Sequence, residues 1–263
     1  MKGKIFLALL VLATGVIALL AWAVQPPPPK QYPTPNGYDT YVLAAQTMLP
    51  LPVDYDTMDK ERLSEFINAS SDVFDLVSRA DSQECVVPVD VIGKSDEMFD
   101  TAGELRSLAR LWTMRARLET LEGRHDEAGE ILLDLWMICD RSCNGGLLIH
   151  HLVSIAGKQV AVTGLTGLDQ QMSEAVRSKV ATTIGAKNRN TPPKEDLFDT
   201  IMALEKRVNR RELGLFGSLL VNASDSTMPA KQQFFQSFDR LRKLEETLIK
   251  QLQTKLVPDS LAE

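Results

Sequence analysis

The amino-acid sequence predicts an all-α protein in which irregular antiparallel helical hairpins, of the α-solenoid kind, follow one N-terminal transmembrane helix. Three observations lead to this fold class. Residues 5–24 are an uncharged apolar run, and no convincing pair of strands is present. Apolar residues recur every three or four positions through most of the later chain, which is the spacing of a helix face. The roughly 230 residues after the apolar run are enough for one sizeable core or two small ones.

The N-terminal segment predicts a membrane anchor. Residues 1–4, MKGK, form a short basic tail, and Lys2 and Lys4 are expected to stay in the cytoplasm. Residues 5–24 contain no charge, and a helix of that length spans roughly 30 Å, the thickness of a bilayer core. The remaining domain is therefore expected outside the cytoplasmic membrane, either periplasmic or external.

A cleaved signal peptide is the alternative interpretation of the same residues. Ala21-Trp22-Ala23 has the small-x-small pattern that signal peptidase accepts, and cleavage after Ala23 would leave a secreted protein. The apolar run is longer than the ~7–15 residues usual in a signal peptide. This length favours the uncleaved anchor.

Residues 25–37 are expected to be a stiff spacer. Their core, PPPPKQYPTP at 26–35, has six prolines in ten residues. Proline fixes φ and lacks an N–H group, so this stretch cannot continue a helix or join a sheet. We expect it to lift a helical domain, residues 38–263, away from the membrane.

Helices in this domain are predicted from periodicity and from breakers. Asn36-Gly37 is a turn signal, LPLP at 49–52 stops the first helix, and Asn68-Ala69-Ser70-Ser71 can divide the second. Residues 85–92 look β-like, but Pro88 argues against a central strand and favours an extended loop. Thr191 and Pro192 are expected to begin a later helix as its N-cap and first residue. The expected helices cover residues 38–48, 59–80, 101–122, 126–140, 146–165 and 173–186, a stretch that starts at Pro192, and a last stretch from near Pro229 to Leu252.

One hairpin resembles a tetratricopeptide repeat. The resemblance spans about residues 109–142 and rests on LWTMRARLETLEGRHDEAGEILLDLW at 111–136. Small residues would let two helices approach, a glycine would turn the corner, and large apolar residues would fill the seam. Arg115 and Glu119 depart from the pattern, and no clear second copy follows 34 residues later. The matching positions are Trp112, Ala116, Gly123, Ala128 and Leu132.

That resemblance implies a scaffold or interaction role, because repeats of this family mostly bind peptides or proteins in a concave groove. It does not name the partner. The overall charge excludes one class of partner: 29 Lys and Arg against 35 Asp and Glu give −6, or −8 once Lys2 and Lys4 are set aside. Nucleic-acid binding needs surplus positive charge, so no nucleic-acid partner is expected. No cofactor is expected either.

The stretch CDRSCNGGLLIHH, residues 139–151, is the main candidate for chemistry. Cys139 and Cys143 lie four apart, and His150 and His151 follow, so a metal site has to be considered. Adjacent histidines on a helix point about 100° apart, however, and the spacing matches no standard zinc pattern. The favoured interpretation is the end of one helix, a turn at 144–146, and the start of a buried helix. Whether Cys85, Cys139 or Cys143 form a disulfide stays open.

Two other clusters are weaker candidates. His125 beside Asp126 and Glu127 could act as a general base, but these residues suit a solvated first turn of a helix. The basic cluster, defined as Lys206, Arg207, Arg210 and Arg211, could contact a phosphate or lipid headgroup. Flanking Glu205 and Glu212 favour a salt-bridged exposed face instead.

The sequence therefore predicts a membrane-anchored extracytoplasmic helical protein that binds another protein or helps to assemble a complex, with no catalytic residues identified. No phosphate-binding loop, nucleophile elbow, HExxH helix or paired-carboxylate motif is present. The alternative is a metal-binding or hydrolytic domain centred on Cys139, Cys143, His150 and His151.

Overall fold

The structure is a computed structural model that describes residues 30–91, 95–223 and 227–254. Within these ranges the regular structure is entirely α-helical, with no β-strand, so the predicted all-α class is confirmed. The expected cytoplasmic tail and anchor, residues 1–4 and 5–24, lie outside the described part. Among the described helices, none is both long and apolar enough to cross a bilayer.

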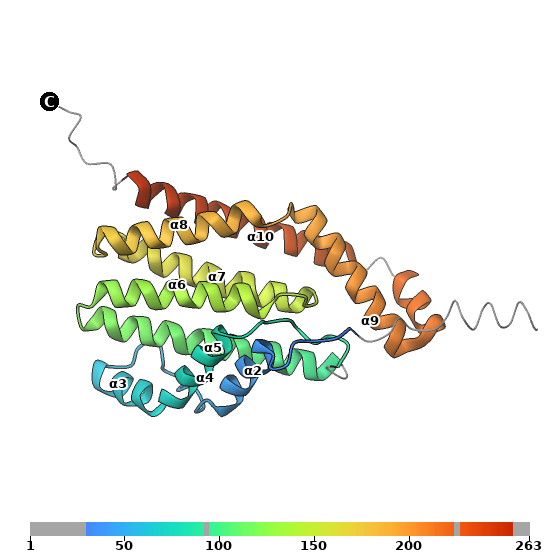
Figure 1. Ribbon diagram of the computed structural model, residues 1–263, viewed down its shortest axis with the longest axis horizontal. Coiled ribbons are helices and arrows are strands. Elements are labelled where there is room, and N and C mark those ends of the chain that lie inside the picture. The colour runs from blue at the N-terminus through green and yellow to red at the C-terminus, as the bar shows by residue number, and fades with distance from the viewer. Residues whose placement is uncertain (1–29, 92–94, 224–226, 255–263) are drawn as a thin grey trace, which may run out of the picture.

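The helices stack in layers across the long axis of the molecule (Figure 1). Helices α2, α3 and α4 cover one side of α5, helix α6 lies on its other side, and α7 packs on α6. Helix α10 then packs along α7 and α8. The helices of the described ranges are α2 Gly37–Thr47, α3 Lys60–Ala69, α4 Ser71–Asp81, α5 Ser95–Leu121, α6 His125–Ser142, α7 Leu148–Leu168, α8 Glu174–Asn190, α9 Lys194–Ala223 and α10 Thr227–Thr254.

Asn36 does more than make the predicted turn before α2. Its side-chain oxygen accepts hydrogen bonds from the N–H of Tyr38 at 3.2 Å and of Val86 at 3.1 Å. Its amide donates to the carbonyl of Val86 at 2.8 Å, and the residue is buried. One side chain therefore caps α2 and also holds the extended segment that follows α4.

The predicted break in the 59–80 stretch is confirmed at Ser70. Helix α3 ends there and α4 begins at the next residue, with Asp59 capping the start of α3 through the N–H of Arg62 at 2.9 Å. Residues 85–91 contain no strand, as expected from Pro88, and form a connector that ends in a turn at residues 89–91, where the N–H of Val91 donates to the carbonyl of Pro88 at 2.8 Å. The N–H of Val87 donates to the carbonyl of Asn144 at 2.8 Å, so this connector is bound to the turn between α6 and α7.

The repeat-like hairpin is built from α5 and α6. Gly123 has a φ of +77° in the turn between them, where glycine adopts the left-handed conformation without strain. The other four positions of the repeat-like pattern are buried in the core: Trp112, Ala116, Ala128 and Leu132. Helix α5 begins at Ser95, six residues before the expected Thr101. The acidic pair Asp96 and Glu97 suits a first helical turn, which the apolar periodicity alone did not reveal.

Helices α6 and α7 approach closely at a glycine. A Cβ added to Gly157 would collide with the Sγ of Cys139, so only glycine fits there beside this buried thiol. The turn before α7 holds Gly145 at a φ of +70°, and Gly146 stays in the turn, donating from its N–H to the carbonyl of Cys143 at 2.9 Å. Helix α7 therefore starts at Leu148, two residues after the expected Gly146.

The series of stacked hairpins stops after α7. Helix α8 packs on α6 and α10, and α9 runs away from it at one end of the molecule, as Figure 1 shows. The expected N-cap at Thr191 is wrong: Thr191 ends α8 in an extended conformation, and α9 begins at Lys194. Pro192 precedes another proline, which disfavours helical backbone at that residue. The carbonyl of Pro193 instead accepts the first helical hydrogen bond, from Leu197 at 3.0 Å.

We predict that Gly157→Ala destabilises the protein by about 1–3 kcal/mol, because the new methyl group overpacks the α6–α7 contact. Cys139→Ala in the same chain should restore part of this loss by removing the sulfur. Chemical denaturation of the two single variants and the double variant gives the coupling energy.

Gly167→Ala is the matched control. It lies on the same helix with nothing within 4 Å of an added Cβ, so it should stabilise by up to about 1 kcal/mol through helix propensity. Equal effects of the two glycine substitutions would contradict the close approach as the cause.

Candidate functional site

The cysteines and histidines of residues 139–151 do not converge. Cys139 faces Gly157 between α6 and α7, and the Sγ of Cys143 lies 3.3 Å from the carbonyl oxygen of Asp140. All three cysteines are free and buried. Burial raises the pKa of both Cys85 and Cys139 to about 12, so neither is a ready thiolate nucleophile.

His150 is a buried structural residue on the first turn of α7. The N–H of Leu147 donates to its Nδ1 at 3.3 Å, so the neutral ring carries its proton on Nε2. That nitrogen lies 3.1 Å from the Tyr38 hydroxyl, which ties α7 to α2. Burial, and then the neighbouring charge of His151, lower the pKa of His150 to about 4. Both ring nitrogens are therefore engaged.

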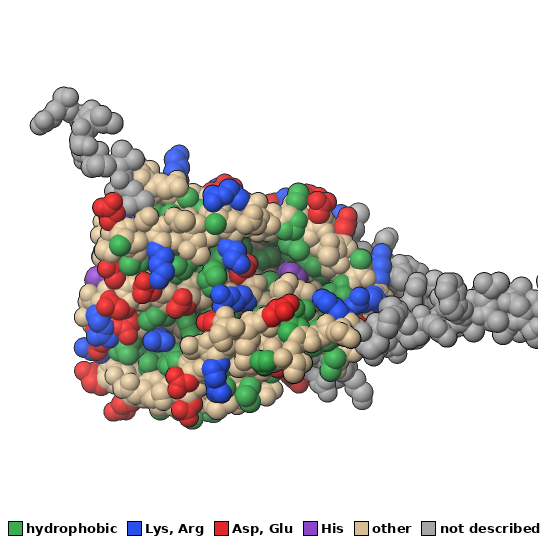
Figure 2. Space-filling model, in the orientation of Figure 1, with side chains coloured by type: hydrophobic (Ala, Val, Ile, Leu, Met, Phe, Trp, Pro, Cys, Tyr) green, Lys and Arg blue, Asp and Glu red, His purple; other side chains and the backbone are tan. Residues whose placement is uncertain are grey.

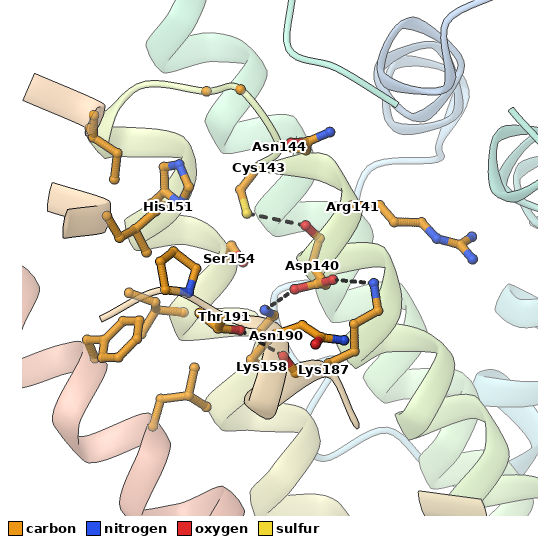
Figure 3. Close-up of a pocket in the computed structure, with 18 of the residues that line it drawn as sticks. Asp140, Arg141, Cys143, Asn144, His151, Ser154, Lys158, Lys187, Asn190 and Thr191 are labelled. Atoms are coloured by element: carbon orange, nitrogen blue, oxygen red, sulfur yellow. Dashed lines mark hydrogen bonds and ion pairs between the residues drawn. The ribbon is translucent and has the colours of Figure 1, made fainter. Parts of the chain in front are cut away.

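His151 lies in a different environment, because it lines a cavity (Figure 3). Burial and then the charge of Lys158 lower its pKa to about 4. In the described ranges, no three His, Cys, Asp or Glu side chains are placed together to hold a metal ion. Of the four residues of the alternative hypothesis, Cys143 and His151 line this cavity, whereas Cys139 and His150 do not.

The cavity has a volume of about 740 Å³, which is the size of pockets that bind small ligands or pieces of a partner. Its walls come from the end of α6 and the following turn, from α7, from the α8–α9 linker and from the facing sides of α9 and α10. One side is apolar and includes Leu197, Ile201, Phe234 and Phe238, while polar and charged side chains from α6, α7 and α8 form the other.

Asp140 is the centre of the polar side. The Lys158 ammonium donates to its Oδ1 at 2.6 Å, and Lys187 donates to its Oδ2 at 3.1 Å (Figure 3). These bonds join α6, α7 and α8. Burial alone would raise the pKa of Asp140, but the two lysines outweigh it and the pKa is lowered. Burial likewise opposes the charge of Lys158, and Asp140 keeps that pKa raised, so both groups are ionised.

A second buried carboxylate lies on α10. Glu245 is 1% exposed, accepts from the Trp136 indole N–H at 2.8 Å and pairs with Arg242 at 3.2 Å. The Lys158 ammonium lies 4.5 Å from the centre of the Trp136 ring, a distance suited to a cation–π interaction. The network inside the cavity thus has three basic groups against two carboxylates, which favours a ligand with acceptor atoms.

Sequence reasoning missed this network. Helix α7 contains one charged residue, Lys158, in 21 positions. A lone charge in a helix expected to be buried was the available signal, because such a charge needs a partner. Asp140 is the last residue of the expected helix 126–140, and nothing in the sequence places Lys187 beside it.

The other sequence candidates lie elsewhere. His125 begins α6, at the opposite end of that helix from the cavity. Glu205 does not pair with the basic cluster: it accepts from the N–H of Leu148 at 2.9 Å, at the start of α7. Arg207 pairs with Asp90 at 3.0 Å, so the expected pairing along α9 is wrong for this residue. The side chains of Arg210, Arg211 and Glu212 lie outside the described set.

Taken together, the described helices form an all-α domain with a cavity that has a polar side and an apolar side. Comparison with family models, with curated proteins and with solved structures found no match to this chain. The tetratricopeptide-repeat resemblance of residues 109–142 therefore stays a prediction.

We predict that Asp140→Asn destabilises the fold by about 3 kcal/mol, because it leaves Lys158 buried without an anion. The double variant Asp140→Asn/Lys158→Met should recover most of this loss. Denaturant unfolding at pH 7 measures both.

Glu130→Gln is the control on the same helix. Its pair with Lys179, at 2.7 Å, is about half exposed, and such surface pairs contribute roughly 0–1 kcal/mol. If Asp140→Asn were as mild as Glu130→Gln, the central role of the Asp140 network would be wrong.

Stability should fall as the pH drops from about 6.5 to 4. In the unfolded chain a histidine titrates near 6.5, whereas His150 and His151 stay neutral in the fold down to about pH 4. The unfolded state therefore binds more protons than the folded state between pH 6.5 and 4. The stability that a neutral His150 contributes is complete above pH 6.5, and roughly 3 kcal/mol of it is lost as the pH falls to 4.

His150→Gln keeps an amide where Nε2 lay and does not titrate. The free energy of unfolding of this variant should decline less steeply between pH 6.5 and 4 than that of the parent. The difference in slope should correspond to at most one bound proton. Denaturation curves at a series of pH values measure the slope. Parallel pH profiles would show that His150 does not stay neutral in the fold.

Proposed function

We propose that this chain is a membrane-anchored, extracytoplasmic helical binding protein that holds a protein partner within a complex. The single observation that carries the binding role is the cavity of about 740 Å³ between α6–α7 and α9–α10, with one polar and one apolar side. Such a surface can pair with backbone groups and receive apolar side chains of a partner at the same time.

The location outside the cytoplasm rests on the sequence. Residues 5–24 have the length and apolarity of a membrane span, Lys2 and Lys4 precede them, and the proline-rich spacer follows. Cleavage after Ala23 would instead yield a secreted form with the same cavity. The intact mass of the native protein distinguishes the two forms, since cleavage removes 23 residues.

The repeat-like hairpin supports an interaction role. Its small residues are buried at the α5–α6 contact and its glycine makes the turn, as the resemblance requires. Hairpins of this kind serve as rigid walls of binding grooves. Here α6 contributes both to the hairpin and to the cavity, through Asp140 and Cys143.

The alternative, a metal-binding or hydrolytic centre at Cys139, Cys143, His150 and His151, is weakened because only Cys143 and His151 of the four line the cavity. Cys139 contacts a glycine of α7, and His150 bonds to Tyr38 and Leu147. A thiol whose pKa is raised and a histidine with both nitrogens engaged are poor catalytic groups. The binding role is therefore the better supported of the two.

The test is to block the cavity with Thr200→Trp. Thr200 is an exposed residue of α9 that lines the cavity, and its hydroxyl bonds back to the carbonyl of Asp196 at 2.8 Å. We expect the amount of partner protein that co-purifies with the full chain from a mild detergent extract to fall at least tenfold in this variant. Quantitative mass spectrometry measures this amount.

Thr163→Trp is the matched control. Thr163 is an exposed residue of α7 outside the cavity lining, with the same back-bond, to Gln159 at 2.8 Å. It should keep every partner. A chain that always purifies alone, or equal losses in both tryptophan variants, would refute the proposed binding role.

A further inference from the structure

The length of chain before the domain restricts how the domain can sit beside the membrane. If residues 5–24 span the bilayer, five residues, 25–29, separate Val24 from Lys30, where the described chain begins, so the two Cα atoms are six steps apart along the chain. A fully extended chain covers at most about 3.6 Å per residue. Lys30 therefore lies no more than about 22 Å from the end of the span. This step rests on the membrane anchor of the proposed function.

The first described residues are bound to one end of the domain. The backbone N–H of Lys30 lies 3.4 Å from a carboxylate oxygen of Asp90, and the Tyr32 hydroxyl donates to the same oxygen at 3.1 Å. The N–H of Asp90 donates back to the Tyr32 hydroxyl at 3.1 Å. Arg207 of α9 pairs with Asp90 as well, so the entering chain is fixed against both the connector and α9.

Two large apolar side chains are exposed near this attachment. Val91, next to Asp90, is 69% exposed, and Phe99 in the second turn of α5 is 62% exposed. Figure 1 shows α5 beginning at the end of the molecule at which the N-terminal chain enters. Phe99 is the one aromatic among the large apolar side chains that are exposed in the described residues. We name the end that carries Lys30, Val91 and Phe99 the entry end.

The entry end also carries positive charge. Lys30 and Lys206 are exposed, Arg207 is partly exposed, and the carboxylate of Asp90 is covered by its partners. Figure 2 shows Lys and Arg side chains gathered at the end of the molecule where the described chain gives way to grey atoms. Lysine and arginine beside exposed apolar side chains are the composition of surfaces that lie on lipid headgroups.

We propose that the entry end rests on the outer surface of the bilayer, with Val91 and Phe99 in the headgroup layer and Lys30 and Lys206 beside lipid phosphates. The occupant of this surface is thus the membrane that anchors the chain. Lys30, Val91, Phe99 and Lys206 do not line the cavity, so this contact leaves the cavity lining free for a partner.

Photo-crosslinking tests the proposal on the full chain in vesicles of three parts phosphatidylethanolamine to one part phosphatidylglycerol. The crosslinking residue p-benzoylphenylalanine replaces Phe99 or Val91, and the same residue at Val53 is the control. Val53 is fully exposed, and its neighbour Asp54 pairs with Arg62 of α3, which lies at the opposite end of the molecule from α9 (Figure 1). Mass spectrometry counts phospholipid adducts.

The expected result is at least tenfold more lipid adduct at positions 91 and 99 than at position 53. In addition, Phe99→Glu should lower the lipid adduct at position 91 several-fold, because a charge resists entry into the headgroup layer. Equal yields at positions 53 and 99, or the absence of lipid adducts at both 91 and 99, would overturn the proposal.

Carbonate extraction of the same vesicles separates this inference from the anchor itself. A chain that stays in the membrane pellet without lipid adducts at positions 91 and 99 refutes the contact and leaves the anchor intact. A chain released by carbonate refutes the anchor, and the contact fails with it.

Discussion

The bond of one carboxylate to two ammonium groups holds the central helices of this protein together. Asp140 of α6 binds Lys158 of α7 and Lys187 of α8 through its two oxygens. Burying these charges is unfavourable unless each finds its partner with good geometry. These ion pairs therefore fix the arrangement of α6, α7 and α8, although α7 and α8 make few direct contacts. The polar side of the cavity results from this arrangement.

The opposite side depends on α10. This helix comes last in the described chain, yet it packs along α7 and α8, and it brings Glu245 against the Trp136 indole and Phe234 into the core. The cavity remains because α9 leaves α8 at the two prolines and contacts α7 and α10 sparingly. The cavity can thus stay open because it has a hydrophobic core on one side and a network of paired charges on the other. No unpaired charge of this network is exposed.

Most of the fold follows from local rules that can be seen in the sequence. Apolar spacing places nearly every helix, Ser70 divides α3 from α4, and Pro88 keeps residues 85–91 out of a sheet. The errors arise where two rules compete. Thr191 and Pro192 look like a helix start, but the second proline delays α9 to Lys194. Asn36 looks like a simple turn residue, and its bonds to Val86 depend on tertiary contacts fifty residues away.

The site was harder to predict for a physical reason. Cysteine and histidine attract attention in a sequence because of their chemistry, yet here they fill space and bond to the backbone, since neighbours on a helix point in different directions. The residues that line the cavity come from five helices, α6 to α10, and from the connector after α4, and only their long-range packing unites them. A single lysine within an otherwise uncharged helix carried more information about the site than the clustered thiols and imidazoles.

The attachment of Tyr32 and Lys30 to Asp90 has a mechanical consequence. Because Arg207 binds the same carboxylate, force applied along the N-terminal segment reaches α9 before it reaches α2. Helix α9 forms one wall of the cavity. Displacement of the N-terminal segment would thus be transmitted to the width of the cavity. With residues 5–24 as the proposed anchor, its lateral movement and the occupancy of the cavity would be coupled quantities.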